Sequence, residues 1–107
     1  MINKLVKEAY ENAIAHGWLD NPRSFGDIIS LIHSELSEAL EEYRNKKSFT
    51  EIYYKGDKPC GIPTEFADVI IRIFDACGEY GIDLEEAIKI KMEYNKSRPF
   101  KHNGKII

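Results

Sequence analysis

The chain has 107 residues, of which 43% are hydrophobic and 31% are charged, and its formal net charge is −3. This length predicts a single domain over residues 1–107, and the composition is typical of a folded globular protein, which argues against a disordered or membrane-embedded chain. No apolar run reaches the roughly 20 residues that cross a bilayer, so we expect no membrane partner.

The charges are unevenly distributed along the chain. Residues 1–88 contain 9 Lys or Arg and 17 Asp or Glu, a balance of −8, whereas residues 89–107 contain 6 basic residues and 1 acidic residue, a balance of +5. A protein that binds duplex nucleic acid needs an extended basic face, so this pattern argues against such a partner. The pattern suits a site that holds metal cations on one side and phosphate on the other.

The N-terminal segment and the cysteines bear on the cellular compartment. Residues 1–17 mix charged and apolar side chains and do not read as a secretory signal. The two cysteines, Cys60 and Cys77, form no CxxC pair and have no metal-type spacing. We therefore expect a cytoplasmic protein with reduced thiols.

Apolar periodicity and capping residues predict two helices in the first half of the chain. The first runs over residues 3–16 and ends at Gly17, and residues 18–23 form a turn. Ser24, followed three positions later by an acidic residue, resembles a capping box. It opens a long second helix that extends to residue 46.

The second half of the chain predicts a loop and two more helices. Residues 47–62 contain two glycines and a proline and predict a loop, with a short strand over residues 52–54 as an open alternative. Helices follow over residues 63–80 and 83–97, and the chain beyond Pro99 is a tail. Four helices with short connections predict an all-α fold in the form of a four-helix bundle.

The second and third helices carry carboxylates beside their apolar faces. On the second helix, Glu35, Glu38 and Glu42 flank the apolar arc. The third helix is apolar over more than half of its circumference and must be covered by more than one neighbour. Its charged residues share one narrow polar strip: Glu65, Asp68, Arg72, Asp75 and Glu79.

Two acidic pairs on neighbouring helices predict a metal site. Residues three apart share a helix face, so Glu35-x-x-Glu38 can oppose Glu65-x-x-Asp68. Four converging carboxylates repel one another unless a cation joins them, and oxygen ligands favour Mg²⁺ or Mn²⁺. Bound Mg²⁺ takes further ligands from substrate phosphates. The alternative for each pair alone is a solvated helix face; the two pairs together favour metal binding.

Three polar residues lie on the arc of the fourth helix that should pack inward: Lys91, Asn95 and Arg98. Inward-facing cations need partners, and phosphate oxygens or the carboxylates can supply them. The alternatives are structural salt bridges to Glu65 or Asp68, or a stripe that emerges at the helix end. The basic segment 101–105 either folds over a phosphate or frays.

Trp18 is the only tryptophan of the chain and lies in the predicted turn. A nucleobase can stack on such a ring. A single tryptophan can equally anchor the core, and the sequence leaves both interpretations open.

These motifs resemble a known family. Three segments resemble the MazG-like branch of the all-α nucleotide pyrophosphohydrolases. They are residues 33–40, which contain Glu35-x-x-Glu38, residues 65–72, which contain Glu65-x-x-Asp68, and Lys91 with Asn95 and Arg98. The resemblance covers residues 16–105. It implies Mg²⁺-dependent hydrolysis of a nucleoside or deoxynucleoside triphosphate to the monophosphate and pyrophosphate, a house-cleaning reaction of the nucleotide pool.

The resemblance also implies roles for individual residues. Glu35, Glu38, Glu65 and Asp68 would ligate Mg²⁺, Lys91 and Asn95 would contact the nucleotide, and the chain would form a homodimer or homotetramer. Glu38, with Glu35, is the first candidate for catalysis. Many family members have a further Glu where this chain has Ser34, and Glu42 is a possible substitute for it.

Two other classes of protein stay open. One is a regulatory module that binds nucleotide or metal without turnover. The other is a structural helical dimer whose acidic strip is solvated. Mg²⁺-dependent pyrophosphate release distinguishes the enzyme from both.

Overall fold

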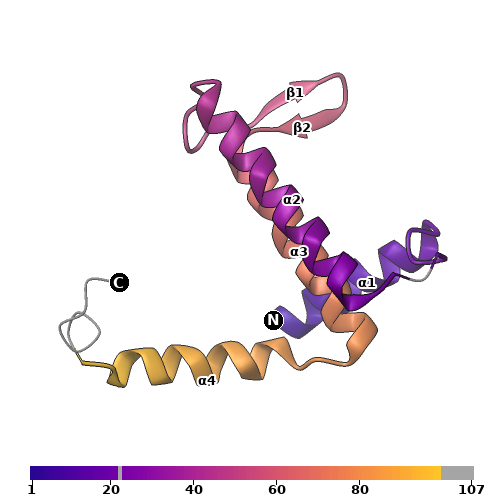
Figure 1. Cartoon of the computed structure of the whole chain (residues 1–107), viewed down its shortest axis with the longest axis vertical. Helices are drawn as coiled ribbons and strands as arrows, with labels where there is room; N and C mark the ends of the chain where they lie inside the picture. Colours follow the sequence, from indigo (N-terminus) through magenta and orange to yellow (C-terminus); the bar gives the residue numbers. More distant parts are fainter. Residues whose placement is uncertain (22, 100–107) are drawn as a thin grey trace.

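The computed structural model describes residues 1–21 and 23–99. These residues form four helices and one hairpin: α1 (Ile2–Ala15), α2 (Phe25–Arg44), β1 (Tyr53–Lys55), β2 (Lys58–Cys60), α3 (Ile62–Tyr80) and α4 (Leu84–Ser97) (Figure 1). The predicted mostly helical fold is confirmed, and each helix begins and ends within two residues of its predicted bounds. No described helix is long and apolar enough to cross a bilayer. The segment 101–105 lies outside the described residues.

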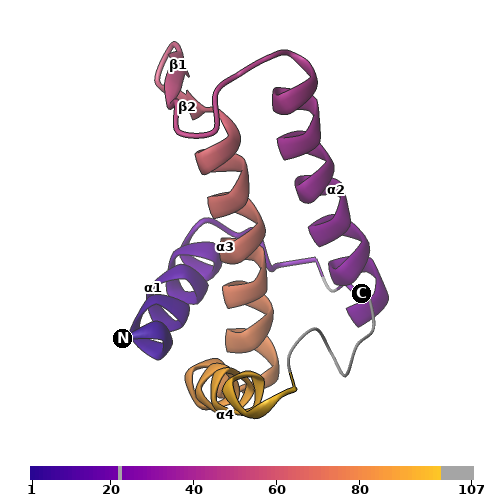
Figure 2. The same ribbon diagram turned by 90° about the vertical axis from the view of Figure 1, so that its left-hand side faces the viewer.

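The helix α3 lies at the centre of the molecule. It packs against α1 on one side and α2 on the other (Figure 2). Gly78 allows the close approach of α1, because a Cβ atom at this position would collide with the ring of Tyr10. The polar strip of α3 is thereby held between two neighbouring helices.

The buried core is small and lies mainly where α1 crosses α3. Val6, Phe74 and Cys77 are buried there. Ile2, Ala9, Ile73 and Leu84 pack around them. This core fixes the C-terminal half of α3 against α1, while α2 packs along α3 and β2 contacts it.

The segment before α3 contains a β-hairpin, which corrects the predicted loop over residues 47–62 and agrees better with the open alternative of a short strand over residues 52–54. β1 and β2 pair antiparallel, with Tyr53 opposite Cys60, Tyr54 opposite Pro59 and Lys55 opposite Lys58. A proline argued against this second strand, but both strands of a two-stranded sheet are edges, where a missing N–H is tolerated. Gly61 then starts α3 with a φ of 123°, and a Cβ atom there would collide with the carbonyl oxygen of Glu51.

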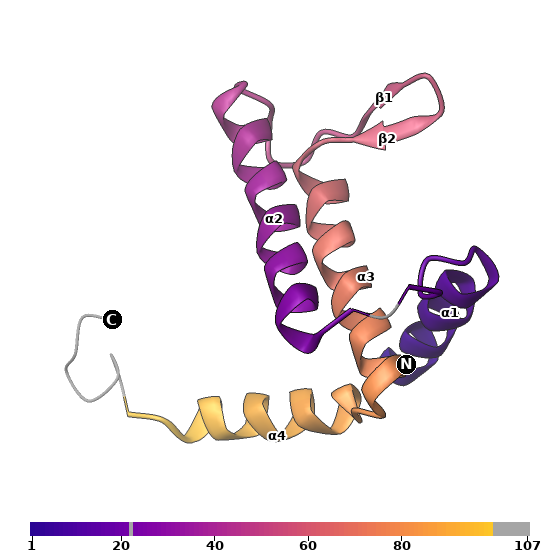
Figure 3. The same cartoon turned by 45° about the vertical axis from the view of Figure 1, so that its right-hand side comes forward.

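The helix α4 extends away from the other helices (Figures 1 and 3). Its N-terminal end is attached to that of α1: the Met1 amino group donates to Glu85 at 2.7 Å, and the Asn3 amide donates to Asp83 at 2.9 Å. None of the α4 residues is buried. The prediction that this helix packs its polar arc inward is therefore wrong for the single chain, because α1 and α2 already cover the two sides of α3.

Candidate functional site

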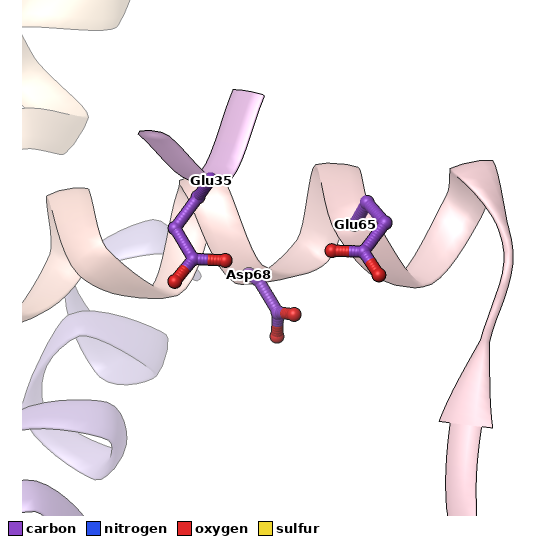
Figure 4. A group of neighbouring side chains, drawn as sticks. All are labelled: Glu35, Glu65 and Asp68. Atoms are coloured by element: carbon purple, nitrogen blue, oxygen red, sulfur yellow. The ribbon is translucent and has the colours of Figure 1, made fainter. Parts of the chain in front are cut away.

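Three of the predicted carboxylates converge between α2 and α3. Glu35 comes from α2, and Glu65 and Asp68 lie one turn apart on α3 (Figure 4). One carboxylate oxygen from each residue lies within 4.8 Å of the other two. Glu35 and Glu65 are half-buried, whereas Asp68 is exposed. The i, i+3 spacing on α3 and the packing of α2 along it produce this cluster.

The electrostatics of the cluster favour a bound cation. Burial raises the pKa of Glu65, and the charges of Asp68, Glu38 and Glu35 raise it further. Although Asp68 is exposed, partial loss of hydration around its carboxylate raises its pKa, with a second contribution from the charge of Glu35, while Lys58 and Arg72 lower it. Neighbouring carboxylates repel one another when all of them are ionised, and a divalent cation between them stabilises the ionised form. The donor set, three carboxylate groups, fits the preference of Mg²⁺ for oxygen ligands.

Glu38 lies at the edge of this cluster. Its carboxylate is exposed and is not one of the three groups whose oxygens converge within 4.8 Å. Its charge nevertheless acts on Glu65, so the two groups are neighbours. The structure thus brings together three of the four predicted ligands and leaves the fourth beside them.

Arg72 holds Glu35 in place. Its Nε atom donates to Oε1 of Glu35 at 3.0 Å, and its Nη2 atom forms an ion pair with the same oxygen at 2.9 Å. The polar strip of α3 predicted the position of Arg72, but sequence reasoning gave it no role at the site. The one signal was its i, i+4 spacing from Asp68, which places it on the same face of the helix.

Glu42, the possible substitute for the missing family glutamate, is engaged by the hairpin. The Tyr53 hydroxyl donates to Oε1 and Oε2 of Glu42, at 2.8 Å to each. This hydrogen bond raises the pKa of Tyr53 to about 12. The contact ties β1 to the end of α2 and orients Glu42 toward the tyrosine.

Two adjoining cavities extend from the cluster. One, of about 370 Å³, reaches from the carboxylates to the turn before α2 and is lined by Trp18, Arg23, Glu35, Asp68, Ile71 and Arg72. The other, of about 140 Å³, continues along α3 to Asp75 and Tyr80. Trp18, Arg23 and Arg72 line both cavities.

Trp18 does not anchor the core. Its side chain is 57% exposed, and its ring lies 4.8 Å from that of His16, measured between centroids. The core interpretation of this tryptophan is therefore wrong, and its ring is available at the mouth of both cavities. Arg23, which follows in the same turn, was not singled out from the sequence.

The predicted residues of α4 are not part of this site in the single chain. Lys91, Asn95 and Arg98 are exposed. The Lys91 ammonium lies 5.2 Å from the centroid of the Tyr94 ring, and the Arg98 guanidinium lies 5.8 Å from it. The helix α4 extends away from α2 and α3, the two helices that carry the carboxylates (Figure 3).

Comparisons with protein-family models, curated proteins and solved structures find no match to the chain. The assignment of a function therefore depends on the chemistry of the carboxylate cluster and the two cavities beside it.

Proposed function

We propose that this protein is a Mg²⁺-dependent nucleoside triphosphate pyrophosphohydrolase of the MazG-like type. The observation that carries the proposal is the convergence of Glu35, Glu65 and Asp68 from two helices beside cavities lined by a tryptophan and two arginines. Carboxylates suit a cation, arginines suit phosphate, and an indole ring suits a base. These are the three chemical parts of a metal-bound nucleotide.

The metal site consists of Glu35, Glu65 and Asp68, with Glu38 beside them. A Mg²⁺ ion held by these carboxylates would neutralise charge on the triphosphate and polarise its phosphorus–oxygen bonds. Both contacts of Arg72 are with one oxygen of Glu35, which leaves Oε2 of this carboxylate for a cation. The chain therefore orients a ligand before any cation arrives.

Other residues of the chain perform the remaining steps. Arg23, Arg72 and Lys58 surround the cluster with positive charge for the phosphates. Glu38 accepts a proton from the attacking water, whose oxygen bonds to the α-phosphorus. The bond from the α-phosphorus to the bridging oxygen breaks, and pyrophosphate leaves with the electron pair. An exposed carboxylate beside the ligand cluster is suited to this proton transfer.

The proposal includes a homodimer or homotetramer. A groove between α2, α3 and the segment before β1 is lined by apolar side chains: Leu36, Ala39, Leu40, Tyr43, Phe49, Ile62 and Phe66. Phe66 is 53% exposed and Leu40 is 49% exposed. Contiguous apolar surface of this kind is a feature of interfaces. A second copy of the chain would then be required for Lys91, Asn95 and Arg98 to contact the nucleotide. It would also be required to complete a four-helix bundle.

The experiment that tests the proposal measures products from a panel of ribo- and deoxyribonucleoside triphosphates. With Mg²⁺, the expected products are a monophosphate and pyrophosphate, and chelation of the metal abolishes their formation. Nucleotide binding without product would assign the chain to a regulatory module instead. Neither binding nor product would indicate a structural role for the acidic strip.

A further inference from the structure

Asp75 lies on the same face of α3 as the cluster, two helical turns beyond Asp68. Seven residues of helix rise by about 10 Å, and this is comparable to the distance from the α-phosphorus of a nucleotide to the far edge of its base. The smaller cavity contains Asp75 and adjoins the cavity that contains Asp68. A nucleotide whose phosphates lie at the cluster would therefore bring its base to Asp75.

The carboxylate of Asp75 has an unused acceptor. Its Oδ1 atom is buried and has no hydrogen-bond partner among the described residues. Burial raises the pKa of Asp75, although the nearby Arg72 lowers it. Arg72 directs its Nε and Nη2 donors at Glu35, and the Glu79 carboxylate accepts from the Tyr10 hydroxyl at 2.6 Å. A buried acceptor without a donor is costly, so a ligand that supplies an N–H gains from filling this position.

We propose that Asp75 is a specificity-determining residue that accepts hydrogen bonds from the Watson–Crick edge of a guanine base stacked on Trp18. This inference rests on the proposed function, because it requires the phosphates of the nucleotide to lie at the carboxylate cluster. Trp18 and Asp75 line the same cavity, so one ligand can contact both.

The hydrogen-bonding pattern of the bases selects guanine. Guanine presents a ring N–H beside an amino group, and a carboxylate can accept from both. Adenine and cytosine place an unprotonated ring nitrogen next to the amino group, which repels a carboxylate oxygen. Uracil and thymine offer one N–H between two carbonyl oxygens. Sites built to accept a hydrogen bond reject ligands that lack the donor, because the buried acceptor is then left unpaired.

The test uses the full chain and two readouts. Trp18 is the only tryptophan, so quenching of its fluorescence by GMP, IMP and AMP reports binding without turnover. We expect GMP to bind roughly ten- to a hundredfold more tightly than AMP, with IMP, which lacks the amino group, in between. The kcat/KM values for GTP, ITP and ATP should follow the same order.

The variant Asp75→Asn keeps the shape of the side chain and turns one acceptor into a donor. It should lose most of the preference for guanine and gain affinity for adenine, to which an amide can both donate and accept. Glu8→Gln is the matched control, because it makes the same carboxylate-to-amide change at an exposed position of α1. This control should leave the order of the bases unchanged.

The outcomes separate this inference from the proposed function. Pyrophosphate release from all triphosphates without a preference for guanine would overturn the role of Asp75 and leave the proposed function intact. An equal loss for every base in Asp75→Asn would also overturn it, since such a loss indicates a structural role. Absence of both nucleotide binding and pyrophosphate release in the wild type would overturn both.

Discussion

At the scale of single residues, Glu35 both belongs to the proposed metal site and forms a contact between α2 and α3. Its Oε1 atom accepts a hydrogen bond from Nε of Arg72 and forms an ion pair with Nη2, and its carboxylate also belongs to the cluster with Glu65 and Asp68. The Arg72 and Glu35 side chains are 36% and 23% exposed, so solvent screens the pair only in part. We regard Arg72 as a positioning residue that acts through Glu35.

The first prediction concerns this positioning. Arg72→Gln should weaken Mg²⁺ binding by about ten- to a hundredfold, because partners that orient a ligand typically contribute that much to metal affinity. Calorimetric titration of Mg²⁺ measures the effect. Arg44→Gln on α2 is the control, since Arg44 pairs only loosely with Glu41, at 3.8 Å on the surface. Equal Mg²⁺ affinity in the wild type and Arg72→Gln would contradict the role of Arg72.

The second prediction concerns the pH dependence of stability without metal. Because the folded state raises the pKa values of Glu65 and Asp68, both groups favour folding most below their unfolded pKa values, and this contribution is lost as pH rises through the folded values. Asp68→Asn should therefore raise the melting temperature at neutral pH by on the order of a few degrees, and should have little effect at strongly acidic pH.

With added Mg²⁺ at neutral pH, the wild type should instead have a higher melting temperature than Asp68→Asn. A ligand at a hundred times its dissociation constant stabilises the folded state by about 2.7 kcal/mol, and the gain should be much smaller for Asp68→Asn. Melting curves with and without Mg²⁺ measure both effects. A variant that is less stable than the wild type in the absence of metal would show that Asp68 makes a favourable contact and is not a strained ligand.

At the scale of the elements, the helices follow from local sequence signals. Ser24 accepts from the backbone N–H of Asp27 at 3.0 Å, as its capping-box pattern predicted, and Asp83 accepts from that of Glu86 at 3.1 Å at the start of α4. Gly81 ends α3 with a φ of 65°, in the left-handed region. Such signals act over three or four residues, and therefore the helix bounds could be predicted closely.

The direction of α4 could not be predicted in the same way. It depends on contacts between residues 80 or more positions apart, such as Met1 with Glu85 and Asn3 with Asp83. Periodicity identifies the apolar arc of a helix but does not say which neighbour covers it. The convergence of Glu35 with Glu65 and Asp68 was predictable because their two helices are consecutive, whereas the unpartnered acceptor of Asp75 required the packed structure.

The third prediction tests α4 itself. Lys91→Ala should lower kcat/KM by roughly ten- to more than a hundredfold, the cost of a lost charge-assisted phosphate contact, and should leave Mg²⁺ affinity unchanged. Lys89→Ala is the control, because this exposed lysine lies two residues away and so on another face of α4. Wild-type kinetics with a lowered melting temperature in Lys91→Ala would show a structural role only.

At the scale of the whole molecule, the single chain is more open than its length requires. Its radius of gyration is 16.6 Å, compared with about 13 Å for a compact chain of 100 residues. Large apolar side chains are exposed on all four helices, including Ile14, Leu36, Ile70 and Ile90. An extended α4 and an uncovered apolar groove both fit a chain that folds against a second copy.

The fourth prediction is that two inactive variants restore each other. If the carboxylates come from one chain and Lys91 from another, a mixture of Glu38→Gln and Lys91→Ala should form mixed dimers with one intact site. Refolding the two variants together in equal amounts should then give about a quarter of wild-type activity, because half of the dimers are mixed and each has one intact site of two. Separate refolding followed by brief mixing is the control.

Activity that stays at the level of the separate variants would place both residues in one chain. Sedimentation provides the independent check of assembly. A stable, folded monomer at low micromolar concentration would contradict the second copy altogether.

The most direct test of the central claim is Mg²⁺-dependent pyrophosphate release by the wild type, Glu38→Gln and Glu41→Gln. Glu41 is the matched control, since it is an exposed glutamate on the same helix that lies outside the cluster. The wild type and Glu41→Gln should release pyrophosphate at equal rates, and Glu38→Gln should release it at least a hundredfold more slowly, the lower bound for loss of a general base. Undiminished release by Glu38→Gln, or no release by the wild type from any triphosphate, would contradict the account.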